Sequence, residues 1–305
     1  MNSLQFKKSQ FKLFCANIGF NPKKVEYIID NIDSYYNEWF EKKPNRKNGG
    51  FKTYKDGTVK IRTIRPSLKE LKIIQKNIKD RILTPIKLPN HIHGGVKKRS
   101  NISNAKPHQG NKYQFTTDLQ AFYPSIKFDR IFDTFLKLGF SNHYSHWLTK
   151  ITTWKYELPQ GTPTSTHISN LVFLETDFKL IDFCNKNNIE YTRYIDDLTF
   201  SSQKCFKHLL NDILEVVTES GFKISYRKTK YAGNQNITGI DVFNNFIDAP
   251  DKILIKSKEE IIKEFKPYSN YLNNIRKTNN RKPTLKVIHI AKSLENPTAQ
   301  AKTCQ

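Results

Sequence analysis

The chain contains few cysteines and no long hydrophobic run. Its four cysteines (Cys15, Cys184, Cys205 and Cys304) are scattered and form neither a CxxC pair nor zinc-site spacing. We therefore expect reduced thiols in a cytoplasmic protein rather than a disulfide framework. No run of about 18 apolar residues is present, so no membrane-spanning helix is expected. The first residues also lack the apolar core of a secretory signal peptide.

Acidic residues are also scarce, which leaves a large excess of positive charge. Lys and Arg number 51 against 28 Asp and Glu, a formal net charge of +23 over 305 residues. An excess of one sign on this scale favours nucleic acid as a partner over a merely solubilising role. The 14 Tyr and 21 Phe add aromatic rings on which bases can stack.

Two of the acidic residues are adjacent, within residues 191–202. Asp196 and Asp197 lie between runs rich in Tyr, Thr, Ile, Leu and Phe, a pattern that predicts a β-hairpin with the acidic pair at its tip. A solvated Asp-Asp turn is the ordinary interpretation, because Asp is common in turns. The alternative is a Mg²⁺ site, since Mg²⁺ prefers carboxylate and phosphate oxygens. The local sequence leaves both open.

A third acidic residue, Asp118, ends a short predicted strand over residues 115–119. Two aromatic residues, Phe122 and Tyr123, follow it closely. This arrangement suits a metal ligand beside a cleft that admits a sugar and a base. The competing interpretation is that Asp118 caps a helix beginning near Lys127, but Ser125 is better placed for that role.

The remaining sequence alternates helical and strand patterns. Residues 4–45 and 252–294 read as helical, and apolar spacing predicts helices over residues 68–83, 131–138, 144–154, 169–183 and 206–220. Strands are expected at residues 222–225 and 237–242. Two β-rich runs around Asp56-Gly57 predict a hairpin over residues 51–64. Its second strand places Lys60 and Arg62 on one face, toward either a triphosphate or template backbone, or solvent.

A histidine-containing run over residues 91–96 reads His-Ile-His-Gly-Gly-Val. Its two histidines, His91 and His93, have no Cys or acidic partner at ligand spacing, so a zinc site is not expected.

The order of these pieces resembles the catalytic core of reverse transcriptases over about residues 60–240. The tetrad Tyr194-Ile195-Asp196-Asp197 resembles the YxDD box of that family. Residues 115–126 resemble its first palm motif and residues 158–165 its LPQG box. Residues 221–229 are similar to the motif that supplies a lysine near the incoming nucleotide.

Within that superfamily the chain resembles bacterial retron reverse transcriptases. Residues 104–108 (Asn-Ala-Lys-Pro-His) match the retron NAxxH signature, and residues 237–239 (Ile-Thr-Gly) are similar to the retron VTG triplet. Three positions depart from the usual retron pattern: Ile195 stands where Ala is frequent, and Thr162 and Thr166 stand where Ala and Pro are commoner.

The resemblance implies an α+β fold shaped as a polymerase right hand, with fingers, an antiparallel palm sheet and a small helical thumb. The expected division is an N-terminal helical region (1–48), fingers (49–110), palm with part of the fingers (111–240), and thumb with a C-terminal tail (241–305).

It also implies roles for individual residues. Two Mg²⁺ ions would be held by Asp118, Asp196 and Asp197, and Lys228 would protonate the leaving pyrophosphate. The implied nucleotide contacts are Lys60 and Arg62 at the triphosphate, Tyr123 as the steric gate against ribonucleotides, and Gln160 at the sugar. The implied RNA-binding residues are Asn104, His108, Ile237, Thr238 and Gly239.

The implied function is RNA-directed DNA synthesis from dNTPs on a structured noncoding RNA that serves as template and primer. Synthesis from an RNA 2′-OH would pass through an RNA–DNA hybrid and yield branched multicopy single-stranded DNA, for anti-phage defence with a separate effector protein. Two alternatives stay open. One is another bacterial reverse transcriptase, of the group II intron, diversity-generating or abortive-infection type. The other is a non-catalytic RNA-binding scaffold with the same fold.

Overall fold

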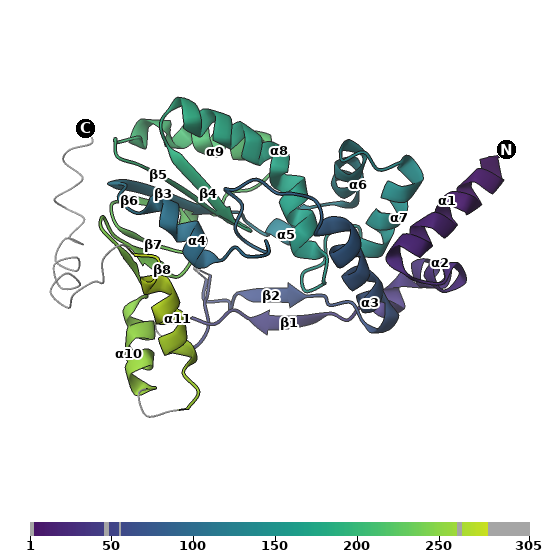
Figure 1. Ribbon diagram of the computed structural model, residues 1–305, viewed down its shortest axis with the longest axis horizontal. Helices are drawn as coiled ribbons and strands as arrows, with labels where there is room; N and C mark the ends of the chain where they lie inside the picture. Colours follow the sequence, from purple (N-terminus) through teal and green to yellow (C-terminus); the bar gives the residue numbers. More distant parts are fainter. Residues whose placement is uncertain (1–2, 46–48, 55, 261–263, 280–305) are drawn as a thin grey trace. The chain divides into compact units, whose positions relative to one another are not determined.

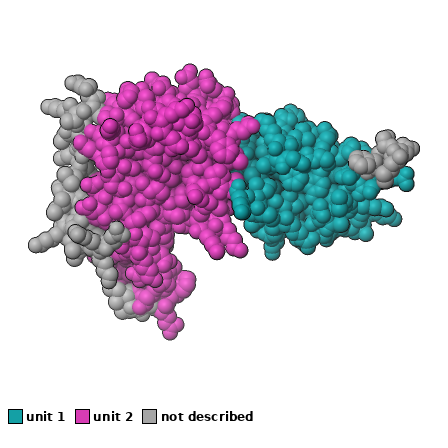
Figure 2. Space-filling model, turned by 45° about the horizontal axis from the view of Figure 1, so that its top comes forward, with its two compact units in different colours: residues 1–87, 121–173 teal, residues 88–120, 174–305 magenta. Residues whose placement is uncertain are grey.

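The computed structural model describes residues 3–45, 49–54, 56–260 and 264–279, and the chain divides into two compact units (Figures 1 and 2). Unit 1 comprises residues 1–87 and 121–173, and unit 2 comprises residues 88–120 and 174–305. Each unit is therefore built from two separate stretches of chain. The four-part division expected from the sequence cuts across these units and stays a prediction.

Unit 1 is mainly helical. Residues at helical spacing, such as Phe14 with Ile18 and Leu71 with Ile74, are fully buried and form its core. The ring of Phe14 lies 5.6 Å from that of Trp147 and joins the first helix to α7. Its helices are α1 (Ser3–Ile18), α2 (Pro22–Asp30), α3 (Lys69–Ile78), α5 (Phe122–Ser125), α6 (Phe128–Lys137) and α7 (Asn142–Thr152).

A two-stranded antiparallel sheet in unit 1 corrects one expectation and extends another. Strand β1 (Trp39–Lys42) pairs with β2 (Ile61–Ile64), although residues 4–45 were predicted to be helical throughout. Bulky aromatic residues such as Trp39 and Phe40 favour a strand when a partner supplies backbone hydrogen bonds. The turn around Asp56-Gly57 is present, because Thr53 bridges Val59, but the main ladder of the second strand is with β1.

Unit 2 is built around a four-stranded antiparallel sheet with the order β4-β5-β3-β6. The strands are β3 (Tyr113–Asp118), β4 (Glu190–Tyr194), β5 (Asp197–Ser202) and β6 (Lys230–Ala232). A row of aromatic residues crosses it, with Phe200 opposite both Tyr191 and Phe115. The ring centroids lie 4.8 and 5.7 Å apart, so stacking favours this register over a slipped one.

Two helices, α8 and α9, belong with this sheet. Helix α8 (Ser165–Lys186) runs from unit 1 into unit 2, and α9 (Leu210–Glu219) lies on one side of the sheet, with Ile213 and Val217 buried (Figure 1). Gly221, with a φ of 79°, follows α9 as predicted, because glycine adopts this left-handed conformation at little cost. The predicted strand at residues 222–225 is reduced to one bridge between Ile224 and Leu119.

A smaller part of unit 2 combines three short strands with three helices. The predicted strand over residues 237–242 is in fact a hairpin of β7 (Gln235–Ile237) and β8 (Ile240–Val242). Thr238 and Gly239 both have positive φ (47° and 86°), which is typical of a two-residue turn. The remaining elements are α4 (Asn101–Ala105), β9 (Ile247–Asp248), α10 (Asp251–Glu259) and α11 (Pro267–Arg276).

The mixture of helices and antiparallel sheets confirms the predicted α+β class. The helical structure expected as far as residue 294 lies outside the described residues beyond 279. Within the described ranges, no helix is both long and apolar enough to cross a membrane.

Candidate active site

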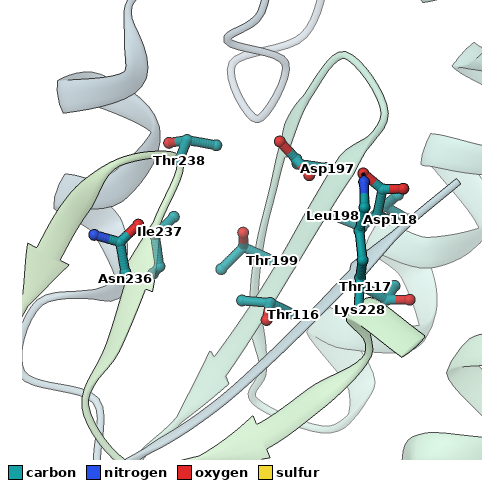
Figure 3. A pocket seen from close by; sticks show the side chains of 10 residues that line it. All are labelled: Thr116, Thr117, Asp118, Asp197, Leu198, Thr199, Lys228, Asn236, Ile237 and Thr238. Atoms are coloured by element: carbon teal, nitrogen blue, oxygen red, sulfur yellow. Dashed lines mark hydrogen bonds and ion pairs between the residues drawn. The ribbon is translucent and has the colours of Figure 1, made fainter. Parts of the chain in front are cut away.

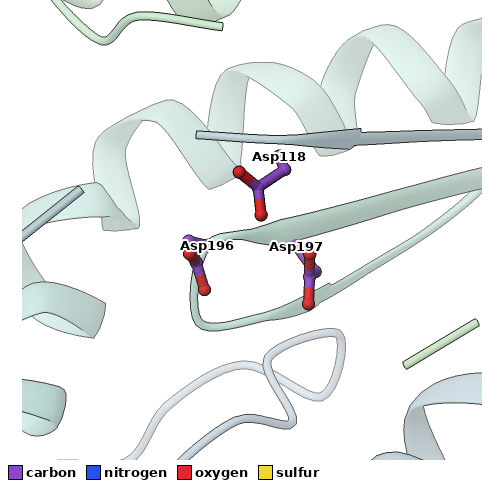
Figure 4. Close-up of side chains that lie close together, drawn as sticks. All are labelled: Asp118, Asp196 and Asp197. Atoms are coloured by element: carbon purple, nitrogen blue, oxygen red, sulfur yellow. The ribbon is translucent and has the colours of Figure 1, made fainter. Parts of the chain in front are cut away.

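Three carboxylates meet where β3 ends and β5 begins. Asp118, the last residue of β3, is directly opposite Asp197, the first residue of β5, and Asp196 lies in the turn that precedes β5. The backbone N–H of Leu119 donates to the carbonyl of Asp196 at 2.9 Å, which ties this turn to the end of β3. Oxygen atoms of all three side chains lie within 4.8 Å of one another (Figure 4).

The predicted hairpin places the acidic pair as expected. Tyr194 and Asp197 are paired across β4 and β5, so Ile195 and Asp196 form a two-residue turn. Ile195 has a φ of 62°, a left-handed conformation that is uncommon for a β-branched residue. Asp118 faces the acidic pair and does not cap α6, because the residue before α6 is Lys127. Ser125, the expected cap, instead donates to the carbonyl of Phe122.

The electrostatics of the cluster favour a bound cation. Burial and repulsion from Asp196 and Asp118 raise the pKa of Asp197 to about 7. Lys228 offsets part of this repulsion, since its Nζ lies 2.5 Å from Oδ2 of Asp118. A set of hard carboxylate oxygens suits a divalent cation, and these three side chains are the residues that would hold it. The donor set therefore fits the metal use that the sequence predicted.

A polar cavity of about 180 Å³ opens beside the carboxylates (Figure 3). Thr116 and Thr199 face each other across β3 and β5 on the face that also carries Asp118 and Asp197. The β7–β8 turn contributes the other wall. The lining residues are Thr116, Thr117, Asp118, Asp197, Leu198, Thr199, Lys228, Asn236, Ile237 and Thr238. A wall rich in hydroxyl and amide groups is able to hydrogen-bond the sugars and phosphates of a nucleic-acid strand.

His108, predicted to bind RNA, is completely buried. Its Nδ1 is 2.7 Å from Oγ of Ser201, and its Nε2 is 2.7 Å from Oγ1 of Thr192. Burial lowers the pKa of the imidazole to about 3, so the ring is neutral at physiological pH. Both ring nitrogens are hydrogen-bonded within the protein, where His108 joins β4 to β5. A role of His108 in RNA binding stays a prediction.

Two further residues of this predicted set are also buried. Ile237 is 1% exposed and belongs to an apolar cluster with Ile240 and Val242, beside the cavity that it helps to line. Asn104 is buried, and its Nδ2 donates to Oγ1 of Thr238 at 3.3 Å. RNA binding by Asn104, Ile237, Thr238 and Gly239 stays a prediction, and Thr238 and Gly239 lie at the tip of the hairpin.

Asn101 is a supporting residue that sequence reasoning missed. Its Nδ2 donates to the carbonyl of Thr238 at 3.1 Å and to the hydroxyl of Tyr271 at 2.6 Å. It therefore joins α4, the β7–β8 turn and α11. The sequence signal is its spacing from Asn104, since residues three apart lie on the same face of a helix.

The four predicted nucleotide-binding residues belong to unit 1, whereas the carboxylates belong to unit 2. Lys60 lies over the ring of Tyr54, and Arg62 is opposite Glu41 in the two-stranded sheet. The hydroxyl of Tyr123 is 3.1 Å from that of Thr166. The carbonyl of Gln160 accepts a hydrogen bond from the N–H of Arg65 at 2.7 Å. The nucleotide contacts of these residues stay predictions.

An antiparallel sheet that presents three carboxylates beside a polar cavity is the arrangement expected of a metal-dependent nucleotidyl-transfer centre. Residues 43–279 match the family described as reverse transcriptase (RNA-dependent DNA polymerase). The chain belongs to the reverse transcriptase family, and its α+β fold is the right-hand fold of these polymerases.

The curated relatives specify the resemblance further. The chain is 33% identical over 186 residues to the retron Ec86 reverse transcriptase of Escherichia coli, covering 59% of this chain and 58% of the relative. It is 30% identical over 190 residues to the retron Se72 reverse transcriptase of Salmonella heidelberg, covering 62% and 47%. The chain thus spans about half the length of such relatives, and they confirm the predicted similarity to retron reverse transcriptases.

A solved structure of apo telomerase from Candida tropicalis is also similar, over 83% of this chain and 55% of that one. Its TM-score is 0.47 and its sequence identity is 9%.

The raised pKa of Asp197 predicts how stability depends on pH in metal-free protein. The folded carboxyl titrates near pH 7, whereas an unfolded aspartate titrates near about 3.9. Between these two pH values the Asp197 carboxyl is protonated in the folded state but ionised in the unfolded state. Its contribution to the free energy of unfolding is therefore fully present below about pH 4 and is lost as the pH rises through 7. Asp197→Asn should remove that decline.

The measurement is urea unfolding at pH 4 to 8 in a chelating buffer, for wild type, Asp197→Asn and the control Asp212→Asn. Asp212 is exposed on α9, so its replacement should leave the pH dependence of wild type in place. A constant free-energy difference between wild type and Asp197→Asn over this range would contradict the assignment.

Proposed function

We propose that the protein is a Mg²⁺-dependent, RNA-directed DNA polymerase of the retron type. The observation that carries the proposal is the set of three carboxylates, with oxygens within 4.8 Å of one another, beside a polar cavity. Two Mg²⁺ ions held by Asp118, Asp196 and Asp197 would supply the charge that activates a primer hydroxyl and stabilises a departing pyrophosphate.

The chain's own residues supply binding and proton transfer. Lys228 is exposed and ion-paired with Asp118, which places its ammonium group beside the carboxylates, where it would serve as the proton donor to pyrophosphate. Lys60, Arg62 and Gln160 hold the incoming dNTP, and the ring of Tyr123 excludes the 2′-OH of a ribonucleotide. The cavity wall formed by Thr116, Thr199 and the β7–β8 turn receives the primer strand.

The nucleic acid that this polymerase copies is a structured noncoding RNA that serves as both template and primer. Several retron reverse transcriptases are among the relatives, and the net charge of +23 suits a folded RNA partner. Synthesis from an RNA 2′-OH yields an RNA–DNA hybrid and then branched multicopy single-stranded DNA. The product acts in the cytoplasm, in anti-phage defence with a separate effector protein.

Replacing the acidic pair tests the proposed catalysis. The double variant Asp196→Asn/Asp197→Asn should lose DNA synthesis by about three orders of magnitude or more, because amides replace charged metal ligands. RNA binding should stay within a factor of about three, since the phosphate contacts are made by basic residues. Primer extension and RNA filter binding measure the two quantities, with Asp212→Asn as a matched control.

Retained synthesis by the double variant would refute the assignment of the carboxylates. A wild-type protein that binds RNA but extends no primer would instead support the scaffold alternative. Sequencing the nucleic acid that copurifies from the native locus separates retron from other reverse transcriptases. A single short DNA joined to one RNA is expected, and heterogeneous DNA would point to another type.

Tyr123 provides a separate test of substrate selection. Tyr123→Ala should raise the kcat/KM ratio of ribonucleotide to deoxyribonucleotide by about 10- to 100-fold, because a smaller side chain leaves room for the 2′-OH. Tyr123→Phe is the matched control. It removes the hydroxyl that contacts Thr166 but keeps the ring, so selectivity should be retained. Unchanged selectivity in the alanine variant would exclude Tyr123 as the gate.

A further inference from the structure

The turn that carries Asp196 has an unfavourable backbone conformation. Ile195, with a φ of 62°, is β-branched, and such a residue adopts a left-handed conformation only when its surroundings enforce it. Asp196 follows directly, so relaxation at Ile195 would redirect the Asp196 carboxylate away from Asp118. Unit 2 contains two sets of contacts on this turn that the catalytic assignment does not use.

The first set of contacts comes from Arg193, two residues before Ile195. Its Nη1 donates to the carbonyl of Ile195 at 3.0 Å. The rest of its guanidinium forms a bidentate pair with Asp177 of α8, at 2.9 and 2.6 Å. The hydroxyl of Tyr191 donates to Asp177 at 2.8 Å and fixes that carboxylate. The guanidinium is thus oriented from helix α8 toward the backbone of the turn.

This ion pair is completely buried, since Arg193 and Asp177 are both 0% exposed. The positive charge of Arg193 lowers the pKa of Asp177 despite burial, so both groups stay ionised. A buried ion pair contributes little net stability, because removing two charges from water offsets their attraction. The ion pair instead fixes an orientation, since the rigid planar guanidinium of Arg193 hydrogen-bonds both the carboxylate of Asp177 and the carbonyl of Ile195.

The second set of contacts comes from the histidine-containing run that fits no zinc site. The N–H of Arg193 donates to the carbonyl of His91, and the N–H of His93 donates to the carbonyl of Arg193, both at 2.8 Å. The run is thereby hydrogen-bonded along β4 and brings Gly94 against the turn. A Cβ on Gly94 would lie 2.6 Å from the backbone nitrogen of Ile195, so only glycine fits.

We propose that Arg193 is a positioning residue for the metal site. Together with Asp177 and Gly94, it holds the Ile195 turn in the conformation that keeps the Asp196 carboxylate beside Asp118 and Asp197. These three residues form a turn clamp that determines the divalent-cation affinity of the carboxylates. The effect on catalysis rests on the proposed function, whereas the effect on cation affinity is independent of it.

Two substitutions test the turn clamp by different routes. Arg193→Lys keeps a positive charge beside Asp177 but loses the second arm that reaches Ile195. Gly94→Ala keeps the ion pair and pushes a methyl group into the turn. Arg276→Lys is the matched control, because Arg276 of α11 makes a bidentate pair with the buried Asp248, outside the carboxylate site.

The primary readout is the dissociation constant for Mn²⁺, used as a probe for Mg²⁺ and measured by titration calorimetry on the full chain. Arg193→Lys and Gly94→Ala should each weaken Mn²⁺ binding by about 10- to 100-fold, the usual effect of losing a group that orients metal ligands. Single-turnover nucleotide addition should show a lower rate with unchanged KM for primer–template. Arg276→Lys should lower Tm while leaving Mn²⁺ affinity as in wild type.

Wild-type Mn²⁺ affinity in folded Arg193→Lys and Gly94→Ala would overturn the turn clamp, and so would an equal loss of affinity in Arg276→Lys. If Arg193→Lys does not fold, Gly94→Ala decides. A wild-type protein that binds Mn²⁺ but synthesises no DNA would refute the proposed function, while the Mn²⁺ affinities would still test the clamp. A wild-type protein that binds no Mn²⁺ would refute both.

Discussion

The mutual repulsion of three closely placed carboxylates is the constraint on which the site in unit 2 depends. Three carboxyl groups with oxygens within 4.8 Å of one another are held together by the register of the central sheet. The stacked row through Phe200 pairs β5 with β3, and the same register places Asp118 opposite Asp197 three residues away. A slip of one residue would move these side chains to the other face. The aromatic core on one face of the sheet thus imposes the acidic cluster on the opposite face.

Around this cluster, hydrogen bonds of buried polar groups hold strands and turns in place, which apolar packing alone would not do. His108 joins β4 to β5 through two hydroxyls, and the ion pair of Arg193 with Asp177 reaches the turn itself. Each such group is stabilising only when its hydrogen bonds are satisfied, so each also restricts the backbone to one geometry. Asn101 connects the β7–β8 turn to α11 in the same manner.

Much of the site could be predicted from the sequence because its signals are local. The hairpin around Asp196, the strand ending at Asp118 and the helix ended by Gly221 all follow from short-range patterns. The prediction was wrong where pairing depends on a distant segment, as in β1, whose partner strand lies about 20 residues further on. The burial of His108 was not predicted either, since sequence alone does not distinguish a buried hydrogen-bonded histidine from an exposed one. The turn clamp depends on three separated segments that only the fold brings together.

The most direct test of the central claim is anomalous diffraction from crystals of the protein grown with primer–template and soaked with Mn²⁺. We predict anomalous peaks in contact with Asp118 and Asp196, with the ammonium group of Lys228 displaced from the Asp118 oxygen with which it forms an ion pair in the structure. Crystals that show no peak at the three carboxylates at saturating Mn²⁺, with Lys228 still paired to Asp118, would contradict the account.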